Sequence, residues 1–297
     1  MKKLVECVPN FSEGKDRGKI NKIFNGAQKV KGVKVFELEW DKSHNRSLFT
    51  IVGEPNDVLK SVFESIKVAI KLIDMEKHHG EHPRIGAIDV VPFIPVSGVS
   101  MKECIALANK LGRKVAEELK IPVYLYEEAA KKKDRRNLAD VRRGQYEGLR
   151  EEIKTKRDKK PDYGPSEFHK TAGAVVIGAR KYLIAYNVNL DSRDVEVAKD
   201  IASEIREKGG GLPAVKAMGF KVDGYAQVSI NLVDYEKTNI DKVYFEIEKL
   251  AKKKKISIKN SEIYGMIPLN SLVKMVKDQL KADGFKVDQV LETKIFE

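Results

Sequence analysis

Short runs of β-branched and aromatic residues alternate with amphipathic helical patterns along this chain, and this alternation strongly constrains its fold. The strand-like runs of the first half span residues 4–8, 32–40, 46–53 and 87–96. Helical patterns fill the segments 19–30 and 55–73. Only DKSHN separates the second run from the third, which favours an antiparallel hairpin. The resulting order is βαββαβ, the plan of a split βαβ sandwich.

The second half repeats this plan. A helix over 100–119 and a strand over 122–128 first extend the N-terminal sandwich. From about Ala174 the order starts again, with KYLIAYNVNL as a strand and PLNSLVKMVKDQLKA as the closing helix. We therefore expect an α/β chain (an α+β sandwich) of two ferredoxin-like βαββαβ-type subdomains, each a mixed sheet with helices packed on it.

The length of 297 residues suits two domains, and we expect them to span 1–179 and 180–297. The polar, Lys-rich segment 154–166 ends in PDYGPS and is a candidate linker, because this composition is typical of an irregular loop.

Positive charge is concentrated in one part of the chain. The net charge is +12, and residues 131–160 hold 13 Lys and Arg against 6 Asp and Glu, a local surplus of +7. Nucleic acid or a small acidic ligand would account for this surplus equally well. The KKKK run at 252–255 is typical of a solvated face. Because no aromatic string of the RNA-binding type lies on the strands, we expect no nucleic-acid partner.

Other sequence features bear on the cellular location of the chain and on the cofactors that it could need. Cys7 and Cys104 lie far apart and outside any CxxC spacing, so we expect neither a disulfide framework nor a structural zinc site, and we expect a cytoplasmic location. No window approaches 18 consecutive apolar residues, so we expect no membrane association. No nucleotide-binding glycine loop is present, so we expect no requirement for ATP or NAD.

Three of the five histidines, His78, His79 and His82, fall within five residues. Imidazole is a common zinc ligand, but HHxxH is not the HExxH pattern, and Gly80 and Pro83 disfavour the helix that such a pattern needs. We therefore expect no metal here. The first two histidines are expected to be exposed at a helix C-terminus, where the helix dipole favours them.

His82 precedes a strand-like run and is the candidate for acid/base chemistry, since an unperturbed imidazole titrates at about pH 6.5. Which carboxylate tunes its pKa stays open among Glu81, Asp89, Glu39 and Asp41.

Longer strings make the chain recognisable. In order, they are VECVPNFSEGK (5–15), HNR (44–46), LIDM (72–75), GEHPRIGAIDVVPFIPV (80–96), EELKIPVYLYEEAA (117–130), PDYGPSEFHKTAGAVVIGARKYLIAYNVNL (161–190), AQVSINLVDYE (226–236) and SEIYGMIPL (261–269). Together they cover nearly the whole chain and closely resemble the glutamate formimidoyltransferases. The resemblance implies two α/β subdomains with folate in a cleft between them, commonly in a homodimer. Nothing in this chain matches the cyclodeaminase part of the bifunctional animal enzymes.

The resemblance also implies site residues. His82, in the GEHPR string, falls on the family's proton acceptor, and the GPxxxxxxAG stretch falls on its folate-binding loop. The loop comprises Gly164, Pro165, Ser166, Glu167, Phe168, His169, Lys170, Thr171, Ala172 and Gly173. Tetrahydrofolate is the implied one-carbon carrier.

The implied reaction moves a formimino group between 5-formimidoyltetrahydrofolate and glutamate. Because both ligands are anionic, cationic side chains should contact them. Candidate substrate-binding residues are Glu39, Asp41, His44, Asn45, Arg46, Arg84 and Arg180. Tyr163 and Phe168 could stack on the folate rings or belong to the core. A formyl donor or a folate analogue at the same site is the alternative, and a basic nucleic-acid-binding protein is a distant one.

Overall fold

The computed structural model describes residues 2–295 and divides into two compact units, Met1–Arg180 and Lys181–Glu297. Each unit has its own sheet and its own buried hydrophobic core, so each has the organisation of a folding domain.

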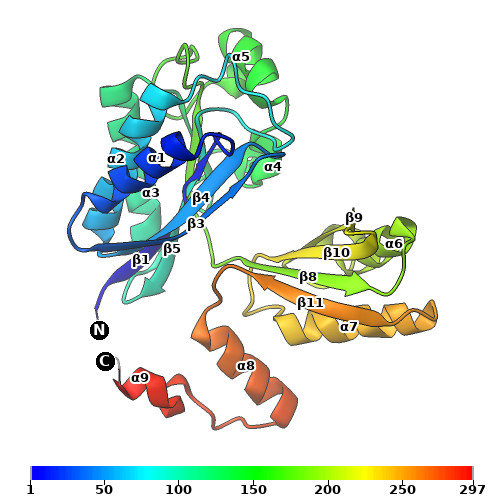
Figure 1. Ribbon diagram of the computed structural model, residues 1–297. Helices are drawn as coiled ribbons and strands as arrows, with labels where there is room; N and C mark the ends of the chain where they lie inside the picture. The colour runs from blue at the N-terminus through cyan, green and yellow to red at the C-terminus, as the bar shows by residue number, and fades with distance from the viewer. Residues whose placement is uncertain (1, 296–297) are drawn as a thin grey trace. The chain divides into compact units, whose positions relative to one another are not determined.

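The first unit contains a βαββαβ set followed by additional elements (Figure 1). The elements are β1 (Leu4–Cys7), β2 (Asn10–Phe11), α1 (Arg17–Gln28), β3 (Val33–Asp41), β4 (Arg46–Gly53), α2 (Pro55–Leu72), β5 (Ile88–Ser97), α3 (Met101–Leu119), β6 (Val123–Glu127), α4 (Leu138–Val141), α5 (Gln145–Thr155) and β7 (Val175–Ala179). Both β1 and β2 pair antiparallel with β4 on one side and β5 on the other, and β3 pairs with β4. This is the strand arrangement of a ferredoxin-like sandwich.

Local signals explain where the helices of this unit begin. The Asp16 carboxylate accepts a hydrogen bond from the Gly18 amide at 2.9 Å and caps α1. Pro55 is the first residue of α2, a position that needs no amide hydrogen. Ser100 and Glu103 form a reciprocal capping box at the start of α3.

Side chains of the first sheet alternate between two cores. Val123 and Leu125 of β6 belong to the cluster that packs with α1, α2 and α3, whereas Tyr124 and Tyr126 belong to a cluster with residues of α4 and α5. Successive side chains of a strand point to opposite faces, so helices cover this sheet on both sides. The second layer, α4 and α5, lies beside the segment that carries His82 (Figure 1).

The second unit repeats the sandwich in its simplest form. It contains β8 (Ile184–Leu190), α6 (Val195–Ile205), β9 (Val215–Val222), β10 (Tyr225–Leu232), α7 (Ile240–Lys253), β11 (Ile258–Tyr264), α8 (Leu269–Leu280) and α9 (Leu291–Ile295). The strand order is β11-β8-β10-β9, with every pair antiparallel. The expectation of two ferredoxin-like sandwiches is confirmed, but only the first sheet is mixed, because the second contains antiparallel pairs throughout.

Two parts of the first unit differ from the expectations. The strand β7 does not begin a second sandwich, because it lies parallel to β5 and β6 in the first sheet. Its residues are all buried, so the run lacks the alternation that marks a half-exposed strand. The segment 154–166 is not a linker, because its Asp162 forms a buried ion pair with Arg135 at 2.6 Å. The basic segment 131–160 contains α4 and α5.

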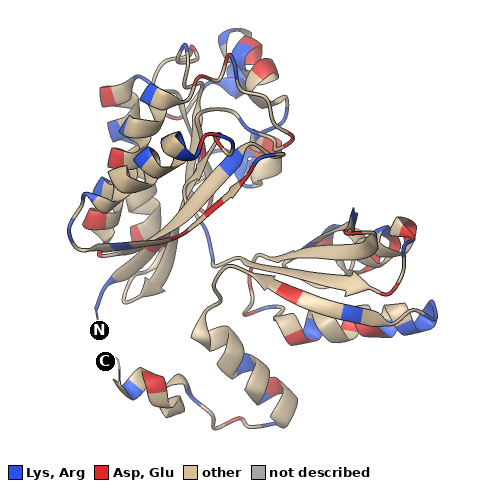
Figure 2. Ribbon diagram, in the orientation of Figure 1, with Lys and Arg blue, Asp and Glu red and all other residues tan. Residues whose placement is uncertain are grey.

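Charged residues of both signs are interspersed along the helices (Figure 2). On α7, Lys252 pairs with Glu248 at 3.0 Å, and just beyond the helix Lys254 pairs with Asp200 at 2.9 Å. The 252–255 run is exposed, as expected of a solvated face. Within residues 2–295, no helix combines the length and the apolar character needed to cross a membrane.

Candidate functional site

Asn45 joins two segments at the turn between β3 and β4. It has a left-handed backbone, with φ of 48°. Its side-chain oxygen accepts a hydrogen bond from the Gly14 amide at 2.8 Å, and its side-chain nitrogen donates to the His79 carbonyl at 2.9 Å. Gly80 packs so closely that a Cβ there would lie 2.4 Å from the His44 carbonyl oxygen. These contacts hold the histidine-rich segment against the hairpin.

His82 is half-buried beside this turn, and its Nε2 lies 2.8 Å from Nη1 of Arg46. A guanidinium can only donate, so Nε2 accepts this hydrogen bond and the imidazole proton resides on Nδ1. Burial, followed by the charges of Arg46, Arg142 and His44, lowers the pKa of His82 to about 3, and a hydrogen bond to the Pro83 carbonyl opposes this effect. The structure therefore holds His82 as a neutral imidazole.

A buried ion pair lies near Arg46 and His82. Asp89 of β5 is 1% exposed, and its carboxylate pairs with Arg142 at the end of α4. Its second oxygen accepts a hydrogen bond from the Ile85 amide at 3.1 Å. Burial raises the pKa of Asp89, while Arg142 opposes the rise. Asp89 thus anchors the start of β5 and also acts electrostatically on Arg46.

Acidic residues of β3 surround Arg46 from the hairpin side. Asp41 pairs across the hairpin with Arg46, and the charges of Glu39 and Asp41 both act on the Arg46 guanidinium. Asp41 also accepts hydrogen bonds from the backbone amide of His44 at 2.6 Å and contacts its Nδ1 at 2.8 Å. These bonds lower the pKa of Asp41.

The three neighbouring histidines have different environments. His78 is buried rather than exposed, which corrects the expectation from the sequence, because α2 ends at Leu72 and the chain then folds inward. Its Nε2 donates to the Asn45 carbonyl at 3.0 Å, and its Nδ1 accepts from Arg84 at 3.3 Å. His79 is exposed, as expected. The structure thus brings only His82 to the Arg46 guanidinium.

Arg84 forms an ion pair within the first unit. Its side chain is 7% exposed and donates to the Glu147 carboxylate at 2.7 and 2.9 Å and to Gln145 at 3.1 Å. Both partners lie at the start of α5, so Arg84 ties the His82 segment to that helix. Arg180 is half-buried at the end of β7, and its charge acts on the buried carboxyl of Glu6.

The loop from Gly164 to Gly173 is bonded to the His82 segment. Gly86 and Gly173 form a β-bridge, flanked by hydrogen bonds from the Ala87 amide to the Ala172 carbonyl at 2.8 Å and from the Ala174 amide to the Ile85 carbonyl at 3.1 Å. The loop and His82 lie in separate segments of the sequence, and no sequence pattern predicts this contact.

A cavity of about 280 Å³ lies beside this loop. It is lined by Tyr146, Arg150, Lys154, Glu167, Phe168, His169 and Lys170. The rings of Tyr146 and Phe168 are 5.5 Å apart, and Phe168 also packs against the hydrophobic core. The cavity therefore combines aromatic and cationic side chains.

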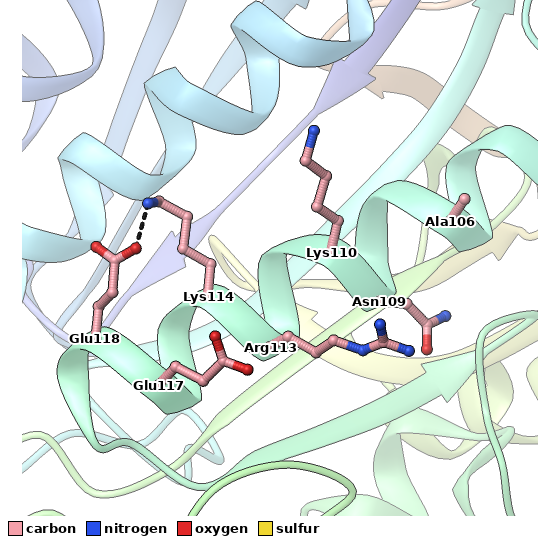
Figure 3. A pocket seen from close by; sticks show the side chains of 7 residues that line it. All are labelled: Ala106, Asn109, Lys110, Arg113, Lys114, Glu117 and Glu118. Carbon is pink, nitrogen blue, oxygen red and sulfur yellow. Dashed lines mark hydrogen bonds and ion pairs between the residues drawn. The ribbon is translucent and has the colours of Figure 1, made fainter.

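Tyr163 faces α3 instead. Its hydroxyl donates to Asn109 at 2.6 Å, and Lys131 lies 4.0 Å from its ring centroid. A hollow of about 530 Å³ follows α3, and all of its lining side chains belong to that helix (Figure 3). None of these lining residues belongs to the His82 segment or the 164–173 loop.

Arg142 acts on His82 and pairs with Asp89, but no sequence pattern singles it out. It lies in the 131–160 segment, where the many basic residues conceal which one pairs with Asp89. The available signal was Asp89, a carboxylate inside an apolar strand that needs a cationic partner.

Comparison with known proteins bears on the whole chain. Residues 4–180 match the formiminotransferase domain, N-terminal subdomain, and residues 185–293 match the formiminotransferase domain. A glutamate formimidoyltransferase of Thermoplasma acidophilum is 46% identical, over 98% of this chain and 97% of that protein. One of Streptococcus pyogenes serotype M1 is 40% identical, over 98% of each. A formimidoyltransferase-cyclodeaminase of Dictyostelium discoideum is 42% identical, over 99% of this chain and 56% of that protein. The resemblance noted in the sequence is confirmed, and the chain belongs to the formiminotransferase family.

Proposed function

We propose that this chain transfers a formimino group between tetrahydrofolate and glutamate, with His82 as the general base. The observation that carries the proposal is the end-to-end match to two glutamate formimidoyltransferases, which spans both units. His82 is the histidine that falls on the family's proton acceptor in the sequence resemblance, and its imidazole is neutral and lies beside the hairpin turn, where it can accept a proton once Nε2 is free.

The chemistry needs one base. In the direction of glutamate consumption, the glutamate nitrogen forms a bond to the formimino carbon, and the bond from that carbon to the folate nitrogen breaks. An ammonium cannot attack, so a base must take its proton, and the departing nitrogen must receive one. His82 can do both in turn, because a neutral imidazole accepts a proton and an imidazolium returns it.

The proposed folate contacts are the residues of the Gly164–Gly173 loop. The loop fits such a ligand in two respects: it lies directly beside the His82 segment, and the adjoining cavity offers aromatic rings together with cationic side chains for an anionic ligand. Folate would supply the nitrogen that carries the one-carbon group.

Among the seven candidate substrate-binding residues, four lie in the group around Arg46 and His82. Glu39, Asp41, His44 and Arg46 form this group, and we propose that they contact glutamate. Asn45 uses its side chain to hold the neighbouring backbone, and Arg84 is engaged by α5, so we propose structural roles for these two.

Turnover with defined donors tests the proposal. Purified protein is incubated with tetrahydrofolate and either N-formimidoyl-L-glutamate or N-formyl-L-glutamate, and the modified folate is quantified. We expect turnover with the formimino donor. Faster turnover with the formyl donor would reassign the substrate to the formyl group. Absence of turnover with both donors, together with no rise in melting temperature on adding tetrahydrofolate, would refute the assignment.

A further inference from the structure

The contact between Arg46 and His82 occupies the atom that a general base needs. Nη1 of Arg46 lies 2.8 Å from Nε2 of His82, and this nitrogen carries the lone pair of the neutral ring. The other ring nitrogen bears the proton. An ammonium can therefore give its proton to His82 only after Arg46 has moved.

The surroundings of Arg46 favour an exchange of partners. It is the first residue of β4 and directly follows the left-handed Asn45. Its guanidinium is half-buried near a second guanidinium, that of Arg142, and burial together with this repulsion lowers the pKa of Arg46. A neutral imidazole offers little compensation for a desolvated cation, whereas a carboxylate binds a guanidinium through two charge-assisted hydrogen bonds.

We propose that Arg46 caps the base in the substrate-free protein and that a carboxylate of the incoming glutamate draws Arg46 away, which frees Nε2 of His82. This inference rests on the proposed function. It makes Arg46 a positioning residue that couples the arrival of the amino-acid substrate to the availability of the base. His82 then stays shielded until a substrate with a carboxylate is bound.

The charged and titratable groups around the pair lie on several elements. Arg46 is on β4, Arg142 at the end of α4, His44 in the hairpin turn, Asp89 on β5, and Glu39 and Asp41 on β3. Only Arg46 among them has a hydrogen bond to Nε2 of His82 in the part of the chain that the structure describes. At His82, removal of Arg46 therefore changes both a charge and a contact, whereas removal of Arg142 changes a charge without a direct contact.

Histidine-selective ¹⁵N NMR over a pH series measures the cap directly. The His82 signal is assigned by its loss in His82→Gln. The pKa of His82 is determined in the wild type and in Arg46→Gln, each free and with glutamate plus tetrahydrofolate, a mixture that holds no formimino group to transfer. Arg143→Gln is the matched control, since it removes a positive charge from an exposed side chain that pairs with Asp140.

In the free protein, we expect the pKa of His82 to be higher in Arg46→Gln than in the wild type by at least about one pH unit, because one contact and one charge are gone. Arg143→Gln should titrate as the wild type does. Glutamate with tetrahydrofolate should raise the pKa of His82 in the wild type, and by less in Arg46→Gln. If Arg46→Gln does not fold, Arg46→Lys replaces it, with an intermediate pKa expected because the shorter ammonium cannot keep the same contact.

If the pKa of His82 is the same in the wild type and in the Arg46 variant, the proposal that Arg46 covers Nε2 is wrong. The proposal is also wrong if glutamate and tetrahydrofolate leave the pKa of His82 in the wild type unchanged. The donor assay is separate: lack of turnover with either donor refutes the proposed function, whereas the ligand-free comparison still decides whether Arg46 covers the base.

Discussion

Gly86 and Gly173 face each other in an antiparallel β-bridge that ties the His82 segment to the glycine-bounded loop. The approach is so close that a Cβ on Gly86 would lie 1.9 Å from the Ala174 carbonyl oxygen and 2.6 Å from that of Ala172. Both of these oxygens belong to the backbone, which cannot rotate away as a flexible side chain could. The proposed base and the proposed folate loop are therefore held by one set of main-chain contacts.

Gly86→Ala should separate these two segments. We expect the free energy of unfolding to fall by at least about 2 kcal/mol, because the added methyl group must displace backbone. Urea denaturation measures the change. Gly148→Ala is the control: Gly148 lies inside α5 with open space at its Cβ, and there alanine should stabilise by about 0.5–1 kcal/mol. A Gly86→Ala variant as stable as the wild type would mean that the bridge is not tight in solution.

Both sandwiches could be predicted from sequence because their elements carry clear periodicity. The helix pattern over 55–73, the run over 46–53 and the closing helix PLNSLVKMVKDQLKA match α2, β4 and α8 closely. The extra strand β7 was hidden because all five of its residues are buried, so burial on both faces removed the alternation.

The site was less predictable, because its contacts join residues far apart in the chain. The sequence suggested a carboxylate partner for His82, but the structure places the Arg46 guanidinium on its ring nitrogen. Arg84 was a candidate substrate-binding residue in the sequence, and only the folded position of Glu147 shows that its guanidinium forms an ion pair there. The Gly164–Gly173 loop lies close to the His82 segment because Gly86 and Gly173 form a backbone bridge, and no pattern of side chains in the sequence encodes that bridge.

Arg84→Gln should affect stability rather than substrate binding. Its guanidinium makes charge-assisted hydrogen bonds to Glu147, so we expect a loss of about 1–3 kcal/mol in the free energy of unfolding. The Michaelis constant for glutamate should stay close to that of the wild type, whereas Arg46→Gln should raise it. Steady-state kinetics beside denaturation separates the effects. A raised Michaelis constant in Arg84→Gln with unchanged stability would return Arg84 to the substrate site.

The buried ion pair of Arg135 and Asp162 should stabilise the first unit against unfolding. Their side chains are 4% and 5% exposed, so truncating one partner leaves the other as an uncompensated buried charge. We expect Arg135→Ala to cost about 3–5 kcal/mol in thermal or urea unfolding. Arg143→Ala breaks an exposed pair with Asp140 and should cost less than about 1 kcal/mol. Similar costs for the two variants would show that the Asp162 carboxylate finds another partner.

Glu6 should make stability depend on pH. It is 4% exposed on β1, and burial raises its pKa from 4.5 to about 7, although Arg180 opposes the rise. The folded protein therefore binds a proton that the unfolded chain releases between about pH 4.5 and 7, so the contribution of Glu6 to stability falls as pH rises through that window.

Glu6→Gln keeps the shape of the protonated carboxyl without its titration. Near pH 4.5 the variant should be about as stable as the wild type, and at pH 8 it should be more stable by up to about 3 kcal/mol. Urea titrations at both pH values measure the difference, with the exposed Glu117→Gln as the control. The prediction fails if the difference between Glu6→Gln and the wild type is the same at both pH values.

His82→Gln tests the proposed base itself. Glutamine keeps polarity and approximate size but cannot accept a proton near neutrality, so the turnover number should fall at least about a hundredfold. The dissociation constant of tetrahydrofolate should change little, because a base acts in the transition state rather than in binding. His79→Gln is the matched control, since the His79 side chain is exposed three residues away and should be dispensable. Turnover of His82→Gln within about tenfold of the wild type would assign the proton transfer to another group.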